Sequence, residues 1–396
     1  MVRKMSEMQM DGGSQGLFVD GDLLAGMLRT CIREVLEEEM SVFLGADRYE
    51  RSGDRRGFRN GSKPRTLKTR VGKLEFEVPQ ARDGGFRPSV FDRYQRSEKA
   101  LVSTMQEMVV QGVSTRRVSD ILEAMSGFSV SAAAVSRAMA DLDEDLSRFR
   151  SRGLGHCQWP YLLIDGRYEK VRKGGKVVSL AVLVAVGISD EGRREVLGWW
   201  LGDSESEATW SVVFRDLKAR GLSGVSLVVS DAHSGIRAAL SRHMQVAAWQ
   251  RCRVHLMREM LKKVSWRDYR ELAKDLRGIH SSEERAQCLK AARDVAEKWH
   301  GKSPSLSRAL LAGVEDTLTV QDLPGEVRKK LYSTNLLERL MRSLKRRTRV
   351  SLIFPNEASC DRLIGALLLE EHEKWVCAAR RYLNLEMMQE AQERMA

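Results

Sequence analysis

Residues 161–188 read YLLIDGRYEKVRKGGKVVSLAVLVAVGI, and this stretch decides the fold class that the sequence predicts. Upstream of about residue 155 the apolar residues recur at helical spacing, whereas here they gather in continuous runs typical of buried strands. Four such runs occur, at residues 161–164, 177–188, 196–201 and 225–229. Helical spacing returns at 210–220 and 235–244, so strands alternate with helices. This alternation indicates an α/β domain with a mixed sheet.

Two aspartates stand at the ends of these apolar runs. Asp165 follows YLLI and Asp231 follows SLVVS, so each carboxylate is expected where a strand leaves the core. Either residue alone also fits a turn, and Asp231 also fits a helix cap. Brought together by adjacent strands, the two would offer the hard oxygen ligands that a pair of Mg²⁺ ions requires. Two such ions activate a water or 3′-OH and stabilise the leaving oxygen in phosphodiester cleavage.

A third carboxylate, Glu338, lies near the start of a predicted helix in the segment STNLLERLMRSLKRRTRV. The helix has an apolar stripe formed by Leu337, Leu340, Met341 and Leu344. Glu338, Arg342 and Lys345 share one flank beside the stripe, which suits a metal site that faces DNA phosphates. Asn335 followed by Glu338 also fits a capping box that merely starts the helix, and both interpretations stay open on these residues.

Cys252 and His255 form a CxxH pair in WQRCRVHL, which could be half of a zinc site. His280 and Cys288 do not supply the other half at the expected short spacing. We therefore expect the CxxH side chains to lie near the catalytic carboxylates or to orient a loop. The chain has neither a GxSxG elbow nor a GxxxxGK[ST] loop, so acyl transfer and nucleotide-driven chemistry are disfavoured.

The first hundred residues predict an amphipathic helix and then a basic segment. Leu24, Leu28 and Ile32 recur at helical spacing, and Gly45 is a stop signal. Residues 48–73 carry ten Lys or Arg against two acids with Gly and Pro between them, which predicts a loop-rich stretch. Such a stretch could contact phosphates or be a solvated arm. The candidate DNA contacts are Arg55, Arg56, Arg59, Arg65, Lys68 and Arg70.

Two short helices are predicted between residues 112 and 143, with SGFSV between them. Their apolar positions are Val118, Ile121, Leu122 and Met125 in the first helix and Val135, Ala138, Met139 and Leu142 in the second. Helices at this separation resemble a helix-turn-helix, whose second helix enters the DNA major groove, although an ordinary helical hairpin has the same pattern. Ser131, which can also cap the second helix, Ser136 and Arg137 are the candidate contacts.

The overall composition fits a polyanionic partner. Lys and Arg number 66 against 54 Asp and Glu in 396 residues, a net charge of +12. This length predicts two or three domains. The six cysteines include no CxxC pair, which favours a reducing cytoplasm, and no apolar run is long enough for a bilayer. We therefore expect a soluble, cytosolic protein.

In their order, these motifs resemble the Mutator-type transposases of bacterial insertion sequences, over nearly the whole chain. That family carries Asp, Asp and Glu with a CxxH motif before the Glu, as Asp165, Asp231, Cys252, His255 and Glu338 do here. Other similar stretches are YERSGDRRGFRNG, TRVGKLEFEVPQARDGGF, GVSTRRVSDILEAMSG, SESEATW and IFPNE. The resemblance implies that the three carboxylates are catalytic and bind two Mg²⁺ or Mn²⁺ ions. It makes Glu338 a ligand as well as a possible cap.

The implied fold is an α/β ribonuclease H-like catalytic domain with a helical insertion, preceded by a mainly α DNA-binding region with a helix-turn-helix. The domains would be an N-terminal helix with a basic DNA-contacting region (1–100), the helix-turn-helix region (101–150), the first part of the catalytic core (155–250), the helical insertion (251–330) and the last part of the core with Glu338 (331–396).

As a transposase of this type, the chain would bind the terminal inverted repeats of its element, cut them and join them to target DNA. Its partners would be double-stranded DNA and a second copy of the chain, in the cytoplasm at the nucleoid, with no nucleotide cofactor and no membrane. The phosphate contacts after Glu338 would be Arg342, Lys345, Arg346 and Arg347. A metal-dependent nuclease or resolvase and an inactive DNA-binding regulator are the alternatives, and the intact triad argues against the regulator.

Overall fold

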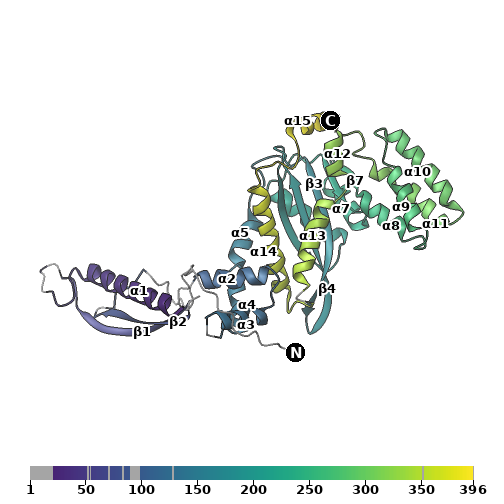
Figure 1. Ribbon diagram of the computed structural model, residues 1–396. Helices are drawn as coiled ribbons and strands as arrows, with labels where there is room; N and C mark the ends of the chain where they lie inside the picture. The colour runs from purple at the N-terminus through teal and green to yellow at the C-terminus, as the bar shows by residue number, and fades with distance from the viewer. Residues whose placement is uncertain are drawn as a thin grey trace, which may run out of the picture. The chain divides into compact units, whose positions relative to one another are not determined.

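The computed structural model describes residues 21–50, 53, 55–69, 72–82, 84–89, 99–126, 129–349 and 352–395 (Figure 1). They form two compact units. Unit 1 contains the described residues up to Val109 and Val113–Ala138, and unit 2 contains Val110–Gly112 and the described residues from Met139 onward. Among the helices of the described residues, none combines the length and the apolar composition that crossing a bilayer requires.

Unit 1 begins with a helix that packs on a two-stranded antiparallel sheet. The helix α1 is Gly21–Leu44, and the strands are β1 (Arg59–Thr69) and β2 (Gly72–Ala81). Leu74, Phe76 and Val78 alternate with exposed residues along β2 and pack on α1. The prediction of a loop-rich stretch was therefore wrong for residues 59–69. The composition of β1 shows no apolar alternation, and its pairing partner β2, rather than its own side chains, makes it a strand.

The remaining helices of unit 1 share a small core. They are α2 (Lys99–Val110), α3 (Thr115–Ser126) and α4 (Ala132–Ala140). Leu101, Val118, Leu122 and Val135 are buried together in this core. The last two helices match the two that periodicity predicts, and Ser131 Oγ accepts a hydrogen bond of 3.2 Å from the Ala134 amide, as the expected cap does. Whether the pair binds DNA as a helix-turn-helix stays a prediction.

Unit 2 is built on a mixed five-stranded sheet in the order β5-β4-β3-β6-β7. Its strands are β3 (Tyr161–Lys173), β4 (Lys176–Ile188), β5 (Arg194–Gly202), β6 (Leu227–Ser230) and β7 (Ala248–Arg251). The strands β3, β4 and β5 are antiparallel neighbours, whereas β6 runs parallel to β3 and β7 runs parallel to β6. Four of the five strands contain the predicted apolar runs. The short β7 was not predicted, because its four residues AWQR, with Trp249 and Gln250 at the centre, form no apolar run before the CxxH segment.

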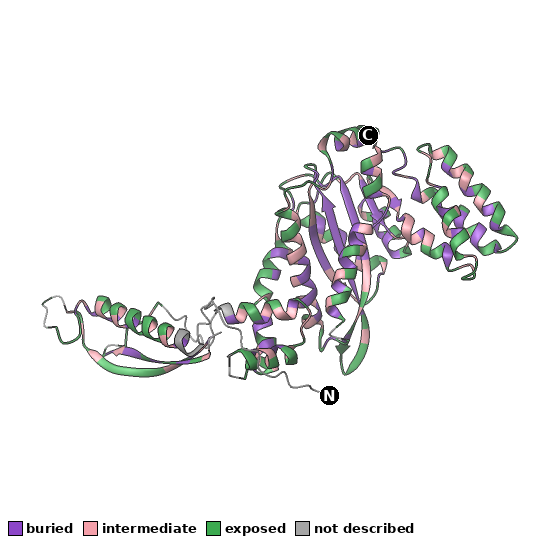
Figure 2. Ribbon diagram, viewed as in Figure 1, coloured by how far each residue is buried: buried purple, intermediate pink, exposed green. Residues whose placement is uncertain are grey.

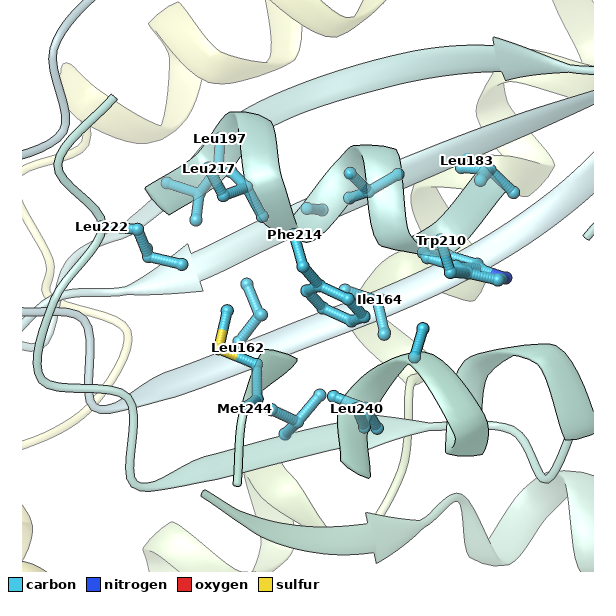
Figure 3. Packing of buried hydrophobic residues seen from close by; sticks show 14 of the residues in the cluster. Leu162, Ile164, Leu183, Leu197, Trp210, Phe214, Leu217, Leu222, Leu240 and Met244 are labelled. Carbon is cyan, nitrogen blue, oxygen red and sulfur yellow. The ribbon is translucent and has the colours of Figure 1, made fainter. Parts of the chain in front are cut away.

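Helices cover both faces of this sheet, and Figure 2 shows the strands buried between them. On one face lie α6 (Glu207–Ala219) and α7 (Ser234–His243). Trp210 and Phe214 of α6 pack on Leu162 and Ile164 of β3 (Figure 3). The helices at the other face are α5 (Asp143–Ser151), α13 (Asn335–Thr348) and α14 (Glu357–Val376). The apolar run of β4 is continuous because both of its faces are covered.

A helical segment with its own core separates β7 from α13. Its elements are α8 (Arg253–Leu261), α9 (Tyr269–Gly278), α10 (Arg285–His300), α11 (Pro304–Gly313), the 3-10 turn Glu315–Thr317 and α12 (Gly325–Leu331). Leu272, Trp299 and Leu310 are buried together within it. The chain then returns to the sheet with α13 and α14 and ends in α15 (Leu385–Met395). The helical tract expected from about residue 251 to 328 is present here.

Candidate catalytic centre

The pairing register of β3 and β6 places Asp165 beside Asp231. Leu163 pairs with Val229 in this parallel ladder. Asp165 and Asp231 follow these two residues at the same distance, two positions further along the sequence. Side chains two residues apart in a strand share a face, so both carboxylates lie on the face opposite Leu162 and Ile164. That face is the one on which α13 packs.

The prediction that Asp165 stands where its strand leaves the core was wrong, because β3 continues to Lys173 and Asp165 pairs within it with Val184 of β4. Asp231 directly follows β6, as predicted. The structure brings the two aspartates together under the helix that carries Glu338.

Asp165 is buried, with 9% of its surface exposed. Burial raises the pKa of Asp165 to about 7, although the nearby His255 opposes this shift, and the charges of Asp231 and Glu205 add to it. The Gly166 amide donates a 2.9 Å hydrogen bond to Asp165 Oδ1, and the His233 amide donates one of 3.2 Å to Asp231 Oδ1. The centre therefore concentrates negative charge that these two amides do not neutralise.

Glu338 does not cap its helix. The N-cap residue of α13 is Thr334, which makes no side-chain cap hydrogen bond, and Asn335 is already helical. The capping-box interpretation was therefore wrong. The Glu338 carboxylate instead accepts two hydrogen bonds from Arg258, of 2.8 Å from Nη1 and 2.6 Å from Nη2. Only 11% of the Glu338 side chain is exposed, so this bidentate pair holds it toward α8.

The CxxH residues lie beside Glu338. His255 Nε2 is 3.8 Å from Glu338 Oε1, and the potential ligand atoms of Cys252, His255 and Glu338 all lie within 4.8 Å of one another. The Cys252 sulfur accepts hydrogen bonds of 3.3 Å from the amide and the hydroxyl of Thr334. Because Thr334 precedes α13 and Cys252 follows β7, these bonds tie the start of the Glu338 helix to the edge of the sheet.

The charges of the CxxH pair reinforce this arrangement. Contact with the Cys252 sulfur, together with the charges of Asp165 and Asp231, raises the pKa of His255 to about 9 against the effect of burial. Burial alone would raise the pKa of Cys252, but His255 and the Thr334 donors lower it on balance. At neutral pH a protonated His255 thus lies near the carboxylates of Asp165, Asp231 and Glu338.

Sequence reasoning missed a fourth carboxylate, Glu205. It precedes α6, is 9% exposed, and finds no hydrogen-bond or ion-pair partner for its carboxylate within the described residues. A Cβ on Gly166 would come within 2.7 Å of the Glu205 carboxyl carbon and would displace that carboxylate, so the Glu205 carboxylate lies directly over the backbone beside Asp165. Burial and the charge of Asp231 raise the pKa of Glu205. The signal was present in SESEATW, but Ser206, which caps α6, gives that motif a purely structural explanation.

Arg258 was also missed, although it stands three residues after His255 on α8, where the same helix face is expected to continue. Of the basic residues predicted to follow Glu338, Arg342, Lys345 and Arg346 are exposed and have no carboxylate partner within the described residues. Arg347 differs, because it forms an ion pair with Glu370 and 12% of its side chain is exposed. Three of the four predicted phosphate contacts are therefore available on the surface.

In unit 1 several predicted DNA contacts have structural partners. Arg59 pairs with Glu37 at 2.5 Å, and Arg55 donates to the carbonyl oxygens of Glu50 and Gly57. Ser136 and Arg137 are exposed on α4. Arg56, Arg65 and Lys68 lie in or just before β1, and Arg70 lies outside the described residues.

The chain is similar to insertion-sequence transposases along almost its whole length. A family model described as "Transposase, Mutator family" matches residues 3–378. The chain is 45% identical over 377 residues to the transposase for insertion sequence element ISRM5 of Rhizobium meliloti, with 94% of each chain covered. It is 42% identical over 360 residues to that for IS406 of Burkholderia multivorans, with 90% of this chain and 92% of the relative covered. The transposase for IS256 in transposon Tn4001 of Staphylococcus aureus is 38% identical over 376 residues, with 93% and 95% covered.

Proposed function

The chain belongs to the Mutator family of transposases, and we propose that Asp165, Asp231 and Glu338 form its metal-dependent centre for cutting and joining DNA. Family membership supports an enzyme that cuts and transfers DNA. The observation that carries the residue assignment is the register of β3 and β6, which puts two carboxylates from distant segments under the helix of the third. In the proposed reaction, the enzyme hydrolyses a phosphodiester at a terminal inverted repeat, and the freed 3′-OH then attacks target DNA.

The donor atoms of the centre fit divalent ions such as Mg²⁺ or Mn²⁺. Asp165 and Glu205 form no salt bridge within the described residues, although the charge of His255 acts on both, and Asp231 lies next to them. Hard carboxylate oxygens are the ligands that these ions prefer. The soft Cys252 sulfur is engaged with Thr334. Two bound ions would supply activation of a water or 3′-OH and neutralisation of charge on the phosphate.

The protein's own cations would assist at the same place. His255 is protonated at neutral pH and lies close to all three carboxylates of the triad, so it can donate a hydrogen bond to a phosphate oxygen. Arg258 positions Glu338 through the bidentate contact. Arg342, Lys345 and Arg346 continue along α13 as exposed cations that can hold the DNA backbone.

The proposal extends to the fold and to the assembly. Three antiparallel strands followed by two parallel ones, with an interposed helical segment before α13, support a ribonuclease H-like core with an insertion. The paired helices α3 and α4 support a helix-turn-helix. A homodimer follows from the need to process two element ends together.

A cleavage and strand-transfer assay tests the assignment. DNA that carries the element ends is incubated with Mg²⁺ and the full chain, or with its Asp165→Asn, Asp231→Asn or Glu338→Gln variant. Glu297→Gln is the matched control, because Glu297 is an exposed carboxylate on α10 without an ion-pair partner within the described residues. We expect the three variants to bind DNA without cutting it. Cleavage at the wild-type rate by any of them would overturn the triad, and cleavage without strand transfer by the wild type would indicate a nuclease.

A further inference from the structure

Unit 2 contains a large basic cavity that the catalytic proposal does not use. This basic cavity has a volume of about 1360 Å³ and is lined by residues of α12, α13, the start of β5 and the segment that joins α14 to α15. Seven cationic side chains line it against two carboxylates, those of Glu326 and Glu386. The cations are Arg193, Arg194, Lys329, Lys330, Arg339, Arg380 and Arg381. The basic cavity therefore carries a strong net positive charge.

Most of this charge has no counter-ion within the described residues. Lys329, Arg339, Arg380 and Arg381 have neither a carboxylate partner nor a hydrogen-bond acceptor for their side chains there. Elsewhere in unit 2, cations such as Lys298 are paired with acids. Burial lowers the pKa of Arg194, and the charge of Arg339 lowers it further, so the cations of the basic cavity repel one another. An anionic ligand would relieve this repulsion.

Aromatic rings stand among the cations. The Arg194 guanidinium lies 4.6 Å from the centroid of the Trp375 ring and 4.9 Å from that of Tyr382, and Lys330 Nζ lies 4.9 Å from the Tyr382 centroid. Tyr332 also lines the wall. Cations that track a phosphate backbone, with aromatic rings on which bases stack, are the combination that binds single-stranded nucleic acid.

The size and shape of the basic cavity narrow the ligand class. Small-molecule sites have volumes of roughly 300–1,000 Å³, and the basic cavity exceeds this range. A duplex is read by elements that project into its grooves, whereas these side chains line a hollow. A flexible, single-stranded polyanion fits a hollow of this size better than a small anion or a stiff duplex.

The basic cavity also adjoins the catalytic centre along the chain. Arg339 follows Glu338 directly on α13, and Asn335 and Leu336 from the first turn of that helix also line the basic cavity. A DNA strand held there would contact the helix that carries the third catalytic carboxylate.

We propose that the basic cavity binds a single-stranded segment of DNA next to the catalytic centre, through phosphate contacts to Arg339, Arg380 and Arg381, while the Tyr382 ring holds Arg194 and Lys330 in the cavity wall. The identity of the polyanion as DNA rests on the proposed function. The cavity and its unmatched charge do not depend on it.

A binding assay with the full chain in EDTA tests this proposal. The fluorescence anisotropy of a labelled oligodeoxythymidylate measures its binding to the protein. The test variants are Arg380→Gln/Arg381→Gln and Tyr382→Leu. The matched control is Arg267→Gln/Arg270→Gln, which removes two exposed cations near the start of α9 that have no carboxylate partner within the described residues. A blunt duplex of the same length is the second probe.

We expect the Arg380→Gln/Arg381→Gln variant to bind the single strand about tenfold more weakly, with a salt slope lower by about 1.4, since single strands contribute about 0.7 per phosphate contact. Tyr382→Leu should weaken single-strand binding by a few-fold, because Arg194 and Lys330 lose the ring that holds them in the cavity wall. The control variant should bind as the wild type does. Single-strand affinity and salt slope unchanged in the arginine variant would overturn the proposal.

Two comparisons separate this result from other outcomes. An equal loss of affinity for the duplex would show a general phosphate-binding surface and would also overturn the single-strand proposal. Because Arg380 and Arg381 are exposed, their variant should fold, and thermal unfolding checks that Tyr382→Leu does. Asp165→Asn should bind the single strand normally, so a failed cleavage assay would refute the catalytic proposal and leave this one standing.

Discussion

Asp275 in the helical segment and Asp165 in the catalytic centre are both shielded carboxylates, but their surroundings differ. Asp275 Oδ2 accepts hydrogen bonds of 2.7 Å from Lys298 Nζ and from Trp299 Nε1. Burial raises the pKa of Asp275, but these two donors outweigh burial and leave the pKa below its usual value. Asp165 accepts one hydrogen bond within the described residues, from the Gly166 amide, and its pKa is raised to about 7.

The pKa values of two histidines in the same regions differ as well. Burial lowers the pKa of His280 in the helical segment to about 3, whereas contact with the Cys252 sulfur raises that of His255 in the centre to about 9. The helical segment thus pairs its shielded Asp275 and keeps its buried His280 neutral, as a domain selected for stability does. The centre pairs Glu338 with Arg258 but leaves Asp165 and Glu205 without a salt bridge within the described residues, which is the pattern of a site that awaits ligands.

The largest expected effect is that of Asp165→Asn. We expect cleavage to fall by more than about 10³-fold, because a catalytic ligand is lost. The free energy of unfolding in metal-free buffer should stay the same or rise, because the neutral amide removes a poorly solvated charge. Cleavage rates and urea unfolding measure the two effects. If this variant unfolds more easily than the wild type, the contrast with Asp275 is wrong.

Acidification should weaken the helical segment. The pKa of His280 is about 3 in the fold and about 6.5 in the unfolded chain, so the unfolded state takes up the proton first. The stability that neutral His280 contributes is complete above about pH 6.5 and is lost as the pH falls toward 3. At about pH 5 this loss amounts to about 2 kcal/mol.

Urea unfolding at about pH 7 and about pH 5 measures this loss, and His280→Gln should lose less stability between the two values. The rest of the loss would include His372, whose pKa burial lowers to about 4. An identical pH dependence in the wild type and the His280→Gln variant would contradict the prediction.

Asp275→Ala should lower the stability and leave cleavage nearly unchanged, which is the reverse of what we expect for Asp165→Asn. Removal of the carboxylate leaves the buried Trp299 Nε1 without its acceptor, so the free energy of unfolding should fall by about 1–2 kcal/mol. Cleavage by the folded protein should stay within about twofold of the wild type. Asp294→Ala, at an exposed carboxylate on the neighbouring α10, is the control and should change stability by less than about 0.5 kcal/mol.

Glu205→Gln should slow cleavage far less than Asp165→Asn does. Its carboxylate lies beside Asp165 and Asp231, and loss of its charge should slow cleavage about tenfold, the lower end of the effect of groups that support a metal site. Glu207→Gln is the matched control, because Glu207 comes from the same SESEATW motif but is exposed and lies 3.7 Å from Arg242. Equal cleavage by the two variants would remove Glu205 from the centre.

Local patterns predicted much of unit 2. The apolar runs predicted four of its strands, and helical spacing predicted α6, α7 and α13, because strand and helix periodicities are properties of a few neighbouring residues. The position of Asp231 directly after β6 was visible for the same reason, whereas the expected strand end at Asp165 was wrong because β3 continues through polar residues to Lys173. In unit 1, β1 and β2 were missed, since β1 is polar and gains its structure from a partner strand.

The sequence by itself determined that two aspartates follow apolar runs, that a glutamate lies in the first turn of a helix and that a CxxH pair precedes a helical tract. Only the tertiary structure decided which of these meet. The register that sets Asp165 beside Asp231, the Arg258 that binds Glu338 and the Glu205 that lies over Gly166 all join segments distant in the chain. Periodicity carries no information on such partners, because register and long-range contacts depend on how whole elements pack.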